Sequence, residues 1–277
     1  MRLFNFFSGK NVLYFQGCDY KKYSEGYELY KKIFSKLGIK FISSDDVGIG
    51  NMSCGLDAWE TGHESETRKI VRRNFEILRE NGFEEIITTS PECYKMFLQN
   101  YPEIIPDWNI NVENIWTLLL DRILKRHSLI KDKLMEVVTF HDNCYLGNYC
   151  DIYEEPRKIL ELIGFEIKEM DNSREDSFCC GSCGGLVFTN PDLANKIAKE
   201  RILQAKRIGI KKMIVIGFKN YDLLKKNIGD SKVEIFELSE VLAHALGIKR
   251  LDEKAISEEP IEGEEKVLTE EKGGEES

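Results

Sequence analysis

The chain has 277 residues, of which 42% are hydrophobic and 10% aromatic, so it can bury one large core or two modest ones. No apolar run approaches the roughly 20 residues that cross a membrane. The net charge is −9, but residues 251–277 hold eleven Asp and Glu against three Lys, which leaves −1 for residues 1–250. A nearly neutral body excludes the basic surface that nucleic acids and anionic membranes require.

Strands and helices alternate along the chain in two similar series. In residues 1–130 the apolar pattern predicts strand 11–16, helix 26–37, strand 40–42, helix 66–81, strand 85–89 and helix 112–125. In residues 131–250 it predicts strand 137–141, helix 155–163, strand 166–168, helix 191–207, strand 212–216 and helix 238–246. Such alternation favours parallel sheets with right-handed crossovers. Residues 251–277, without aromatics and rich in Glu, are typical of a disordered tail.

The second series repeats the first at a nearly constant offset. At an offset of 126 residues Cys18 pairs with Cys144, and Cys54 with Cys180. A repeat of this length indicates two related domains, because the repeats of solenoids are only about 20 to 50 residues long. We therefore predict an α/β fold of two tandemly duplicated domains with small, mainly parallel sheets, related by pseudo-twofold symmetry. The predicted boundaries are residues 1–130, residues 131–250 and an acidic tail, residues 251–277.

The cysteines indicate metal or redox chemistry. Residues 1–10 lack the pattern of a secretory signal, so we expect a cytoplasmic protein, in which clustered cysteines bind metal or do redox work more often than they form disulfides. Three cysteines and three glycines lie within residues 177–185, a loop able to curl around a compact group. Because ligands gather beyond the carboxyl ends of parallel strands, the cysteines that follow predicted strands belong at that edge. The eight cysteines are Cys18, Cys54, Cys93, Cys144, Cys150, Cys179, Cys180 and Cys183.

The order of these cysteines resembles that of the CCG-domain, or cysteine-rich domain, family of iron–sulfur proteins. Its members include the B and D subunits of heterodisulfide reductase and related subunits of glycolate, glycerol-3-phosphate and lactate oxidation systems. The resemblance covers residues of about 10–248. It is carried by residues 90–94 (SPECY), 141–147 (HDNCYLG), 153–157 (YEEPR) and 172–181 (NSREDSFCCG).

The resemblance implies an iron–sulfur centre of the 4Fe-4S type, cubane or non-cubane, in each half. The non-cubane clusters of the family use five cysteines per motif, and the first half departs from that pattern. Ser53 and Ser90 replace two of the cysteines, so Cys18, Cys54 and Cys93 remain. Three interpretations stay open: a three-thiolate cluster with an open iron, a Zn²⁺ ion completed by His63 or water, or free thiols without a metal.

The second half departs in a different way. Gly217 and Asn220 replace its final pair of cysteines, whereas Cys183 is gained. The resemblance then implies a four-thiolate cluster. Its ligands would be Cys144, Cys179, Cys180 and Cys183. For Cys150, a spare ligand and an inert thiol are both open; His141 is either a hydrogen-bond or proton donor to a cluster or an ordinary histidine at the end of a strand.

Resemblance and motifs together predict an iron–sulfur oxidoreductase subunit of heterodisulfide reductase type. It would cleave or form a disulfide of a small thiol substrate. The chain lacks a Cys-x₂-Cys-x₂-Cys ferredoxin run and a Gly-x-Gly-x-x-Gly fingerprint, so electrons would come from a ferredoxin-like or flavoprotein partner subunit. The alternatives are a non-catalytic electron-relay or scaffold subunit of a glycolate- or lactate-oxidation-like complex, and a zinc-stabilised interaction protein. We expect neither nucleic-acid binding nor direct membrane insertion.

Overall fold

The computed structural model describes residues 11–50 and 52–251. Within these residues each half contains one four-stranded sheet, and every pair of neighbouring strands is parallel. The strand orders are β2-β1-β3-β4 and β6-β5-β7-β8, so the second sheet repeats the first. The predicted α/β fold with two duplicated parallel sheets is confirmed. The domain boundaries stay a prediction, and the predicted acidic tail lies, except for Leu251, outside the described residues.

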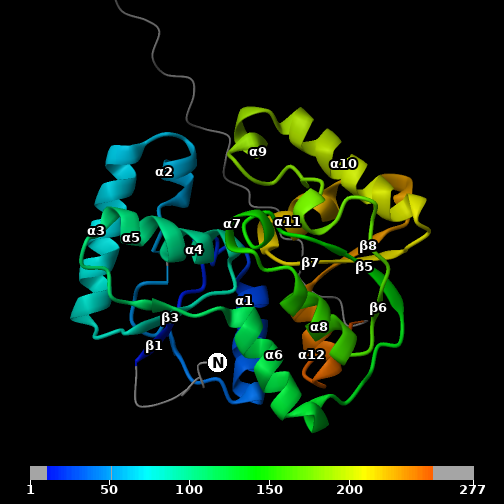
Figure 1. Cartoon of the computed structure of the whole chain (residues 1–277), viewed down its shortest axis with the longest axis horizontal. Coiled ribbons are helices and arrows are strands. Elements are labelled where there is room, and N and C mark those ends of the chain that lie inside the picture. Colours follow the sequence, from blue (N-terminus) through cyan, green and yellow to red (C-terminus); the bar gives the residue numbers. More distant parts are fainter. Residues whose placement is uncertain (1–10, 51, 252–277) are drawn as a thin grey trace, which may run out of the picture.

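The described elements follow one another in the same order in both halves (Figure 1). The first half comprises β1 (Val12–Tyr14), α1 (Ser24–Leu37), β2 (Ile42–Ser43), α2 (Leu56–Glu60), α3 (Glu64–Glu80), β3 (Glu85–Ile87), α4 (Pro91–Lys95), the π-helix η1 (Met96–Asn100), α5 (Tyr101–Ile104), β4 (Asn111–Val112), α6 (Ile115–Lys125) and the 3₁₀ turn η2 (His127–Leu129). The second comprises β5 (Val137–His141), α7 (Gly147–Cys150), α8 (Glu154–Leu162), β6 (Glu166–Ile167), η3 (Arg174–Asp176), α9 (Leu186–Thr189), α10 (Pro191–Arg207), β7 (Lys212–Val215), α11 (Phe218–Lys226), η4 (Gly229–Ser231), β8 (Glu234–Glu237) and α12 (Leu238–Ala245).

The sequence pattern missed one strand and more than one helical segment in each half. The strands are β4 and β8, which add the outer member beside β3 and β7. The predicted helix 112–125 was wrong at its start, because Val112 pairs with Ile86 in the sheet and the helix begins at Ile115. The longest missed helical segments, 91–104 and α11, follow β3 and β7, and the short helices α2, α7 and α9 were missed as well.

Alternating side chains of the central strands supply a core on each face of the sheet. On β1, Leu13 packs into one cluster of the first half and Tyr14 into the cluster that both halves share. On β7, Met213 and Ile214 divide in the same way. Successive residues of a strand point to opposite faces, so each sheet is buried on both sides.

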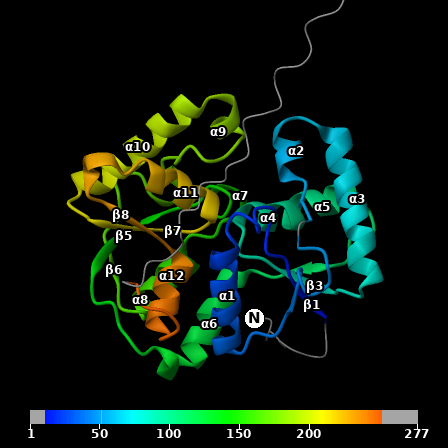
Figure 2. The same cartoon turned by 180° about the vertical axis from the view of Figure 1, so that it is seen from behind.

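Four helices form the layer between the two sheets. Helix α1 packs on α12, and α6 packs on α8 (Figures 1 and 2). Since α8 is the counterpart of α1, and α12 of α6, the two contacts are equivalent under exchange of the halves. Fully buried Ile33 and Trp116 of the first half share this core with Ile159 and Leu242 of the second. The predicted pseudo-twofold relation therefore appears in the packing: the two helix pairs in this layer are equivalent when the halves are exchanged.

None of the helices within residues 11–50 and 52–251 combines the length and the apolar character that crossing a bilayer requires.

Glu237 connects the two halves through a buried carboxyl group. It ends β8, caps α12 and accepts a hydrogen bond from the Tyr30 hydroxyl of α1 at 2.9 Å. Burial raises the pKa of Glu237 from 4.5 to about 7, although hydrogen bonds from Ser239 and Tyr30 act in the opposite direction. The folded chain therefore holds this proton more tightly than the unfolded chain does.

This raised pKa makes stability depend on pH. The contribution of Glu237 is fully present below pH 4.5 and is lost as the pH rises to about 7. We expect Glu237→Gln to remove a pH-dependent part of the unfolding free energy of about 3 kcal/mol. Tyr30→Phe removes a donor to the carboxylate and should steepen the dependence. Urea unfolding at about pH 5 and about pH 8 measures both effects. If the unfolding free energy depended on pH equally in the parent chain, Glu237→Gln and Tyr30→Phe, the assignment would be contradicted.

Candidate metal centre

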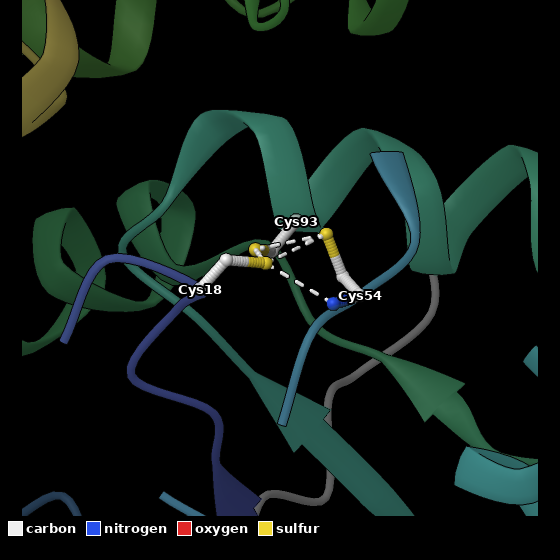
Figure 3. A group of neighbouring side chains, drawn as sticks. All are labelled: Cys18, Cys54 and Cys93. Atoms are coloured by element: carbon white, nitrogen blue, oxygen red, sulfur yellow. Dashed lines mark hydrogen bonds between the residues drawn. The ribbon is translucent and has the colours of Figure 1, made fainter. Parts of the chain in front are cut away.

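Three cysteine sulfurs of the first half meet beyond the carboxyl ends of β1 and β3 (Figure 3). The sulfur of Cys18 lies 3.3 Å from that of Cys54 and 3.6 Å from that of Cys93, and the last two are 3.3 Å apart. Cys54 and Cys93 are buried, whereas Cys18 is half-buried. We call these residues the first-half thiol group. Three residues far apart in the sequence are thus brought together by the two parallel strands and the loop before α2.

The two serines that replace family cysteines hold the backbone of this group. Ser90 caps α4, and its hydroxyl accepts a hydrogen bond from the Cys93 amide at 3.3 Å. The hydroxyl of Ser53 accepts from the Gly55 amide at 3.1 Å and lies 3.9 Å from the Cys18 sulfur. A capping side chain orients the first turn of a helix. The serines therefore position the remaining thiols instead of adding sulfur ligands.

The three thiols shift one another's pKa values. Hydrogen bonds from Cys54 and Cys93 hold the pKa of Cys18 well below its ordinary range, and the Cys54 amide adds a bond of 3.1 Å. The same contact with Cys18 raises the pKa of Cys54, and burial raises that of Cys93. Metals bind the thiolate, so uptake of a metal ion must displace protons from Cys54 and Cys93.

The first-half thiol group fits a thiophilic metal. Thiolates are the ligands of zinc and of iron–sulfur centres. A tetrahedral ion with metal–sulfur bonds of about 2.3 Å holds its sulfurs roughly 3.8 Å apart, close to the spacing seen here. His63 was wrong as a fourth ligand: it is exposed before α3, its Nδ1 lies 2.8 Å from the Thr61 hydroxyl, and it is not part of the group.

The four thiols of the second half form two pairs. The sulfurs of Cys144 and Cys183 are 3.2 Å apart. Cys180 is buried beside Cys179, whose exposed side chain accepts from the Gly181 amide at 3.2 Å. In the part of the chain that the structure describes, the first-half thiol group is the one set of three such ligand atoms within 4.8 Å of one another. A cluster bound by all four thiols stays a prediction.

Packing groups occupy the two positions where the second half lacks family cysteines. Gly217 has φ +95°, and a Cβ there would lie 3.3 Å from Asn143 and Pro91. Asn220 is fully buried, and its Oδ1 accepts from the Ser182 hydroxyl at 2.6 Å. Asn220 thus anchors the loop of Cys183 to α11 without supplying sulfur.

Cys150 and His141 lie outside the thiol groups. Cys150 ends α7 and packs at the edge of the shared core, where burial raises its pKa to about 11. Such a thiol is inert, in line with the second of its two interpretations. His141 is buried and accepts from Arg201 at 3.0 Å through Nδ1; burial and the Arg201 charge lower its pKa well below 6.5. It is therefore a neutral structural histidine.

A cleft of about 590 Å³ is lined by residues of both halves, among them Cys183 and the sequence neighbours of Cys18 and Cys93, Asp19 and Glu92. Its volume is that of a small-molecule site. Tyr145 crosses it and hydrogen-bonds Glu60. The lining residues that carry a charge or a thiol are Asp19, Lys22, Asp57, Glu60 and Glu92 of the first half and Cys183, Lys219, Asp222 and Lys226 of the second.

Lys219 and Glu92 face this cleft from opposite halves, and neither was predicted from the sequence. Lys219 lies 3.3 Å from Asp57 and 3.7 Å from Asp19. Burial opposes its charge, but the carboxylates, Glu92 first, raise its pKa above the ordinary value. Glu92 is 6% exposed, and its Oε1 has no hydrogen-bond partner among the described residues. The internal repeat could have drawn attention to this pair, because at an offset of 127 residues Lys219 aligns with Glu92.

Comparison with known proteins gives the same family for both halves. A family model described as "Cysteine-rich domain" matches residues 12–98 and 138–218. The D subunit of the dihydromethanophenazine:CoB–CoM heterodisulfide reductase of Methanosarcina acetivorans is 30% identical over 70% of this chain and 48% of its own length. The B subunit of the fumarate reductase (CoM/CoB) of Methanothermobacter marburgensis is 31% identical over 83% of this chain and 46% of its own.

A bacterial relative is similar over a smaller share of its length. The probable iron-sulfur-binding oxidoreductase FadF of Bacillus subtilis is 27% identical over 78% of this chain and 31% of its own length. The chain thus spans between about a third and a half of these three relatives.

Replacement of a first-half thiol tests the metal centre. We expect Cys18→Ser, Cys54→Ser or Cys93→Ser each to abolish the metal bound by this half, because serine is a poor ligand for a soft ion. Cys150→Ser, outside the group, is the matched control and should keep its metal. Elemental analysis of anaerobically purified protein measures the loss. Metal content equal to that of the control in all three variants would refute the site.

Gly181 tests the fit of the second-half cysteine loop against α10. It has φ +88°, and an added Cβ would lie 2.7 Å from the Ala194 carbonyl oxygen. Gly209 has φ +76° with no atom within 4 Å, so it shares the backbone strain without the clash. We expect Gly181→Ala to lower the unfolding free energy by about 1–3 kcal/mol more than Gly209→Ala. Denaturant unfolding of metal-free protein measures the difference. Equal losses of unfolding free energy in the two variants would show that the loop shifts to accommodate the added methyl group.

Proposed function

Because the chain belongs to the cysteine-rich domain family, with one copy of the domain in each half, we propose that it cleaves or forms a disulfide as an iron–sulfur oxidoreductase subunit of heterodisulfide reductase type. The relatives named as oxidoreductases support electron transfer in general. The observation that carries the disulfide chemistry is the contact of three buried or half-buried sulfurs, 3.3–3.6 Å apart, beside a cleft of small-molecule size.

The first-half thiol group would hold the centre. When bound, an iron–sulfur centre supplies one-electron transfer at a potential set by its charge, hydrogen bonds and exposure. Cys18, Cys54 and Cys93 bind it as thiolates, and burial of two of them keeps water away. The positive charge of Lys219 lowers the pKa of Cys18 and so favours the thiolate. Metal analysis of the purified chain distinguishes iron from zinc in this group.

The cleft would bind the substrate. Its lining carries five carboxylates and three lysines, so a polar thiol or disulfide finds partners on both walls. Lys22 and Lys226 both contact Asp222, at 2.8 Å and 3.2 Å, so the lysines are engaged by carboxylates in the free protein. Glu92 also lines the cleft, and its buried Oε1 has no hydrogen-bond partner among the described residues.

A partner protein would supply the electrons. The relatives are named as subunits of larger oxidoreductases, and this chain spans about half of their length. We therefore propose a ferredoxin-like or flavoprotein electron-transfer partner. The cytoplasmic location and the use of Cys144, Cys179, Cys180 and Cys183 as cluster ligands stay predictions.

The second candidate is an electron-relay or scaffold subunit that binds no substrate. The loss of family cysteines at Ser53, Ser90, Gly217 and Asn220 favours it, since both halves have fewer sulfur ligands than a five-cysteine cluster uses.

Metal analysis and spectroscopy of the anaerobically purified chain separate these candidates. We expect iron in excess of zinc, lost in Cys18→Ser and kept in Cys150→Ser. The EPR signal of the oxidised protein should change on titration with glutathione or 2-mercaptoethanol, because the substrate thiol enters the cleft beside the centre. Zinc without iron would exclude both iron–sulfur functions. Iron together with an EPR signal that no thiol alters would favour the electron-relay subunit instead.

A further inference from the structure

A carboxylate lies close in sequence to each cysteine of the first-half thiol group. Asp19 directly follows the first of these cysteines, Asp57 lies three positions after the second, and Glu92 directly precedes the third. All three carboxylates line the cleft. A carboxylate near a thiol disfavours the thiolate, which is the form that binds a metal ion. These negative charges therefore oppose metal binding unless a positive charge offsets them.

Lys219 of the other half reaches these carboxylates. Its Nζ lies 3.3 Å from Asp57 and 3.7 Å from Asp19. Burial opposes the charge of Lys219, but the carboxylates, Glu92 first, raise its pKa above the ordinary value. The side chain is 28% exposed, against 65% for Lys226 of the same helix, so solvent screens its charge less. One ammonium group thus faces a carboxylate from each of the three segments that carry the thiols.

The backbone on both sides of Lys219 is fixed. Phe218 stacks on Tyr23 of the first half, with the ring centroids 5.3 Å apart. Asn220 is fully buried and accepts a hydrogen bond from the Ser182 hydroxyl at 2.6 Å. The lysine is therefore held at the cleft by its neighbours in the chain, one of which packs on the first half.

The position of Lys219 on its own helix does not account for its charge. It is the second residue of α11, and the first turn of a helix disfavours a positive charge. Lys225 and Lys226, by contrast, lie in the last turn, where the helix dipole favours them. The groups that stabilise the charge of Lys219 are therefore the carboxylates of the other half, beside the thiols.

We propose that Lys219 is a positioning residue for the metal centre of the other half. Its ammonium group holds together the segments that carry the three thiols, and its charge offsets their carboxylates so that the thiols bind metal as thiolates. The first-half centre then depends on a charge that the second half supplies. The proposal rests on the proposed function only in that the first-half thiol group binds a metal.

Cobalt binding to the full chain tests this role without an iron–sulfur centre. Metal-free, reduced protein is titrated anaerobically with Co²⁺, and the thiolate-to-cobalt absorption that Cys18→Ser removes is followed. We expect Lys219→Met to weaken this binding by about 10–100-fold, the usual effect of losing a group that supports metal ligands. Lys219→Arg retains the charge and should keep most of the affinity. Lys226→Met removes a lysine of the same helix and cleft; it is the control and should bind cobalt as the parent chain does.

A double variant separates the charge of Lys219 from its packing. If the lysine acts by offsetting carboxylates, Glu92→Gln in the Lys219→Met background should recover part of the lost affinity. Urea unfolding of the metal-free variants verifies that each of them folds. An affinity of Lys219→Met equal to that of the parent chain overturns the proposal. A loss of affinity that neither Lys219→Arg nor the double variant relieves also overturns it.

The outcomes also separate this proposal from the proposed function. Zinc without iron in the purified chain, together with the expected cobalt results, would support the role of Lys219 and refute the iron–sulfur function. Iron with a thiol-sensitive EPR signal, together with cobalt binding that Lys219→Met leaves unchanged, would support that function and refute the role of Lys219. A parent chain without any Cys18-dependent cobalt absorption would refute both the metal centre and the role of Lys219.

Discussion

The packing of α1 on α12 and of α6 on α8 is the constraint on which the rest of the molecule depends. These contacts bury a core drawn from both halves, with Ile33, Trp116, Ile159 and Leu242 fully or almost fully covered. Because the layer joins like surfaces, it turns the carboxyl ends of both sheets toward one region. Cysteines that follow strands in separate domains thereby come to line or flank a single cleft, which neither half would form alone.

The two copies differ in charge where they face each other across the cleft. At equivalent positions Glu92 and Lys219 have opposite charges, and Lys219 is held at the cleft by carboxylates of the other half. Ser90 caps a helix where its counterpart Gly217 packs against Pro91, the neighbour of Ser90. The two sites are therefore asymmetric: the first half has a compact set of three thiols, and the second has two pairs.

Much of the fold could be predicted from the sequence, because long amphipathic helices such as α3 and α10 repeat their apolar residues clearly. The outer strands β4 and β8 were missed because they lack an apolar run: β4 pairs an exposed Asn111 with a half-buried Val112, and β8 begins and ends with Glu. Seven of the eight cysteines were assigned to metal or cluster sites, and the set Cys18, Cys54 and Cys93 is the one whose three sulfurs the structure brings together. Sequence order places Cys183 with Cys179 and Cys180, yet its sulfur touches that of Cys144. His63, close in sequence to Cys54, points elsewhere.

The sequence by itself determined the family, the duplication and the thiol chemistry, because those depend on residue types recurring at a fixed offset. Only the tertiary structure decided which thiols meet, since sulfur contacts depend on how loops from β1, β3 and β5 are held by caps and buried hydrogen bonds. It also decided that a cleft exists between the halves and that Lys219 faces Glu92 there. Those facts arise from the burial of four helices against one another, a long-range packing contact that no local pattern records.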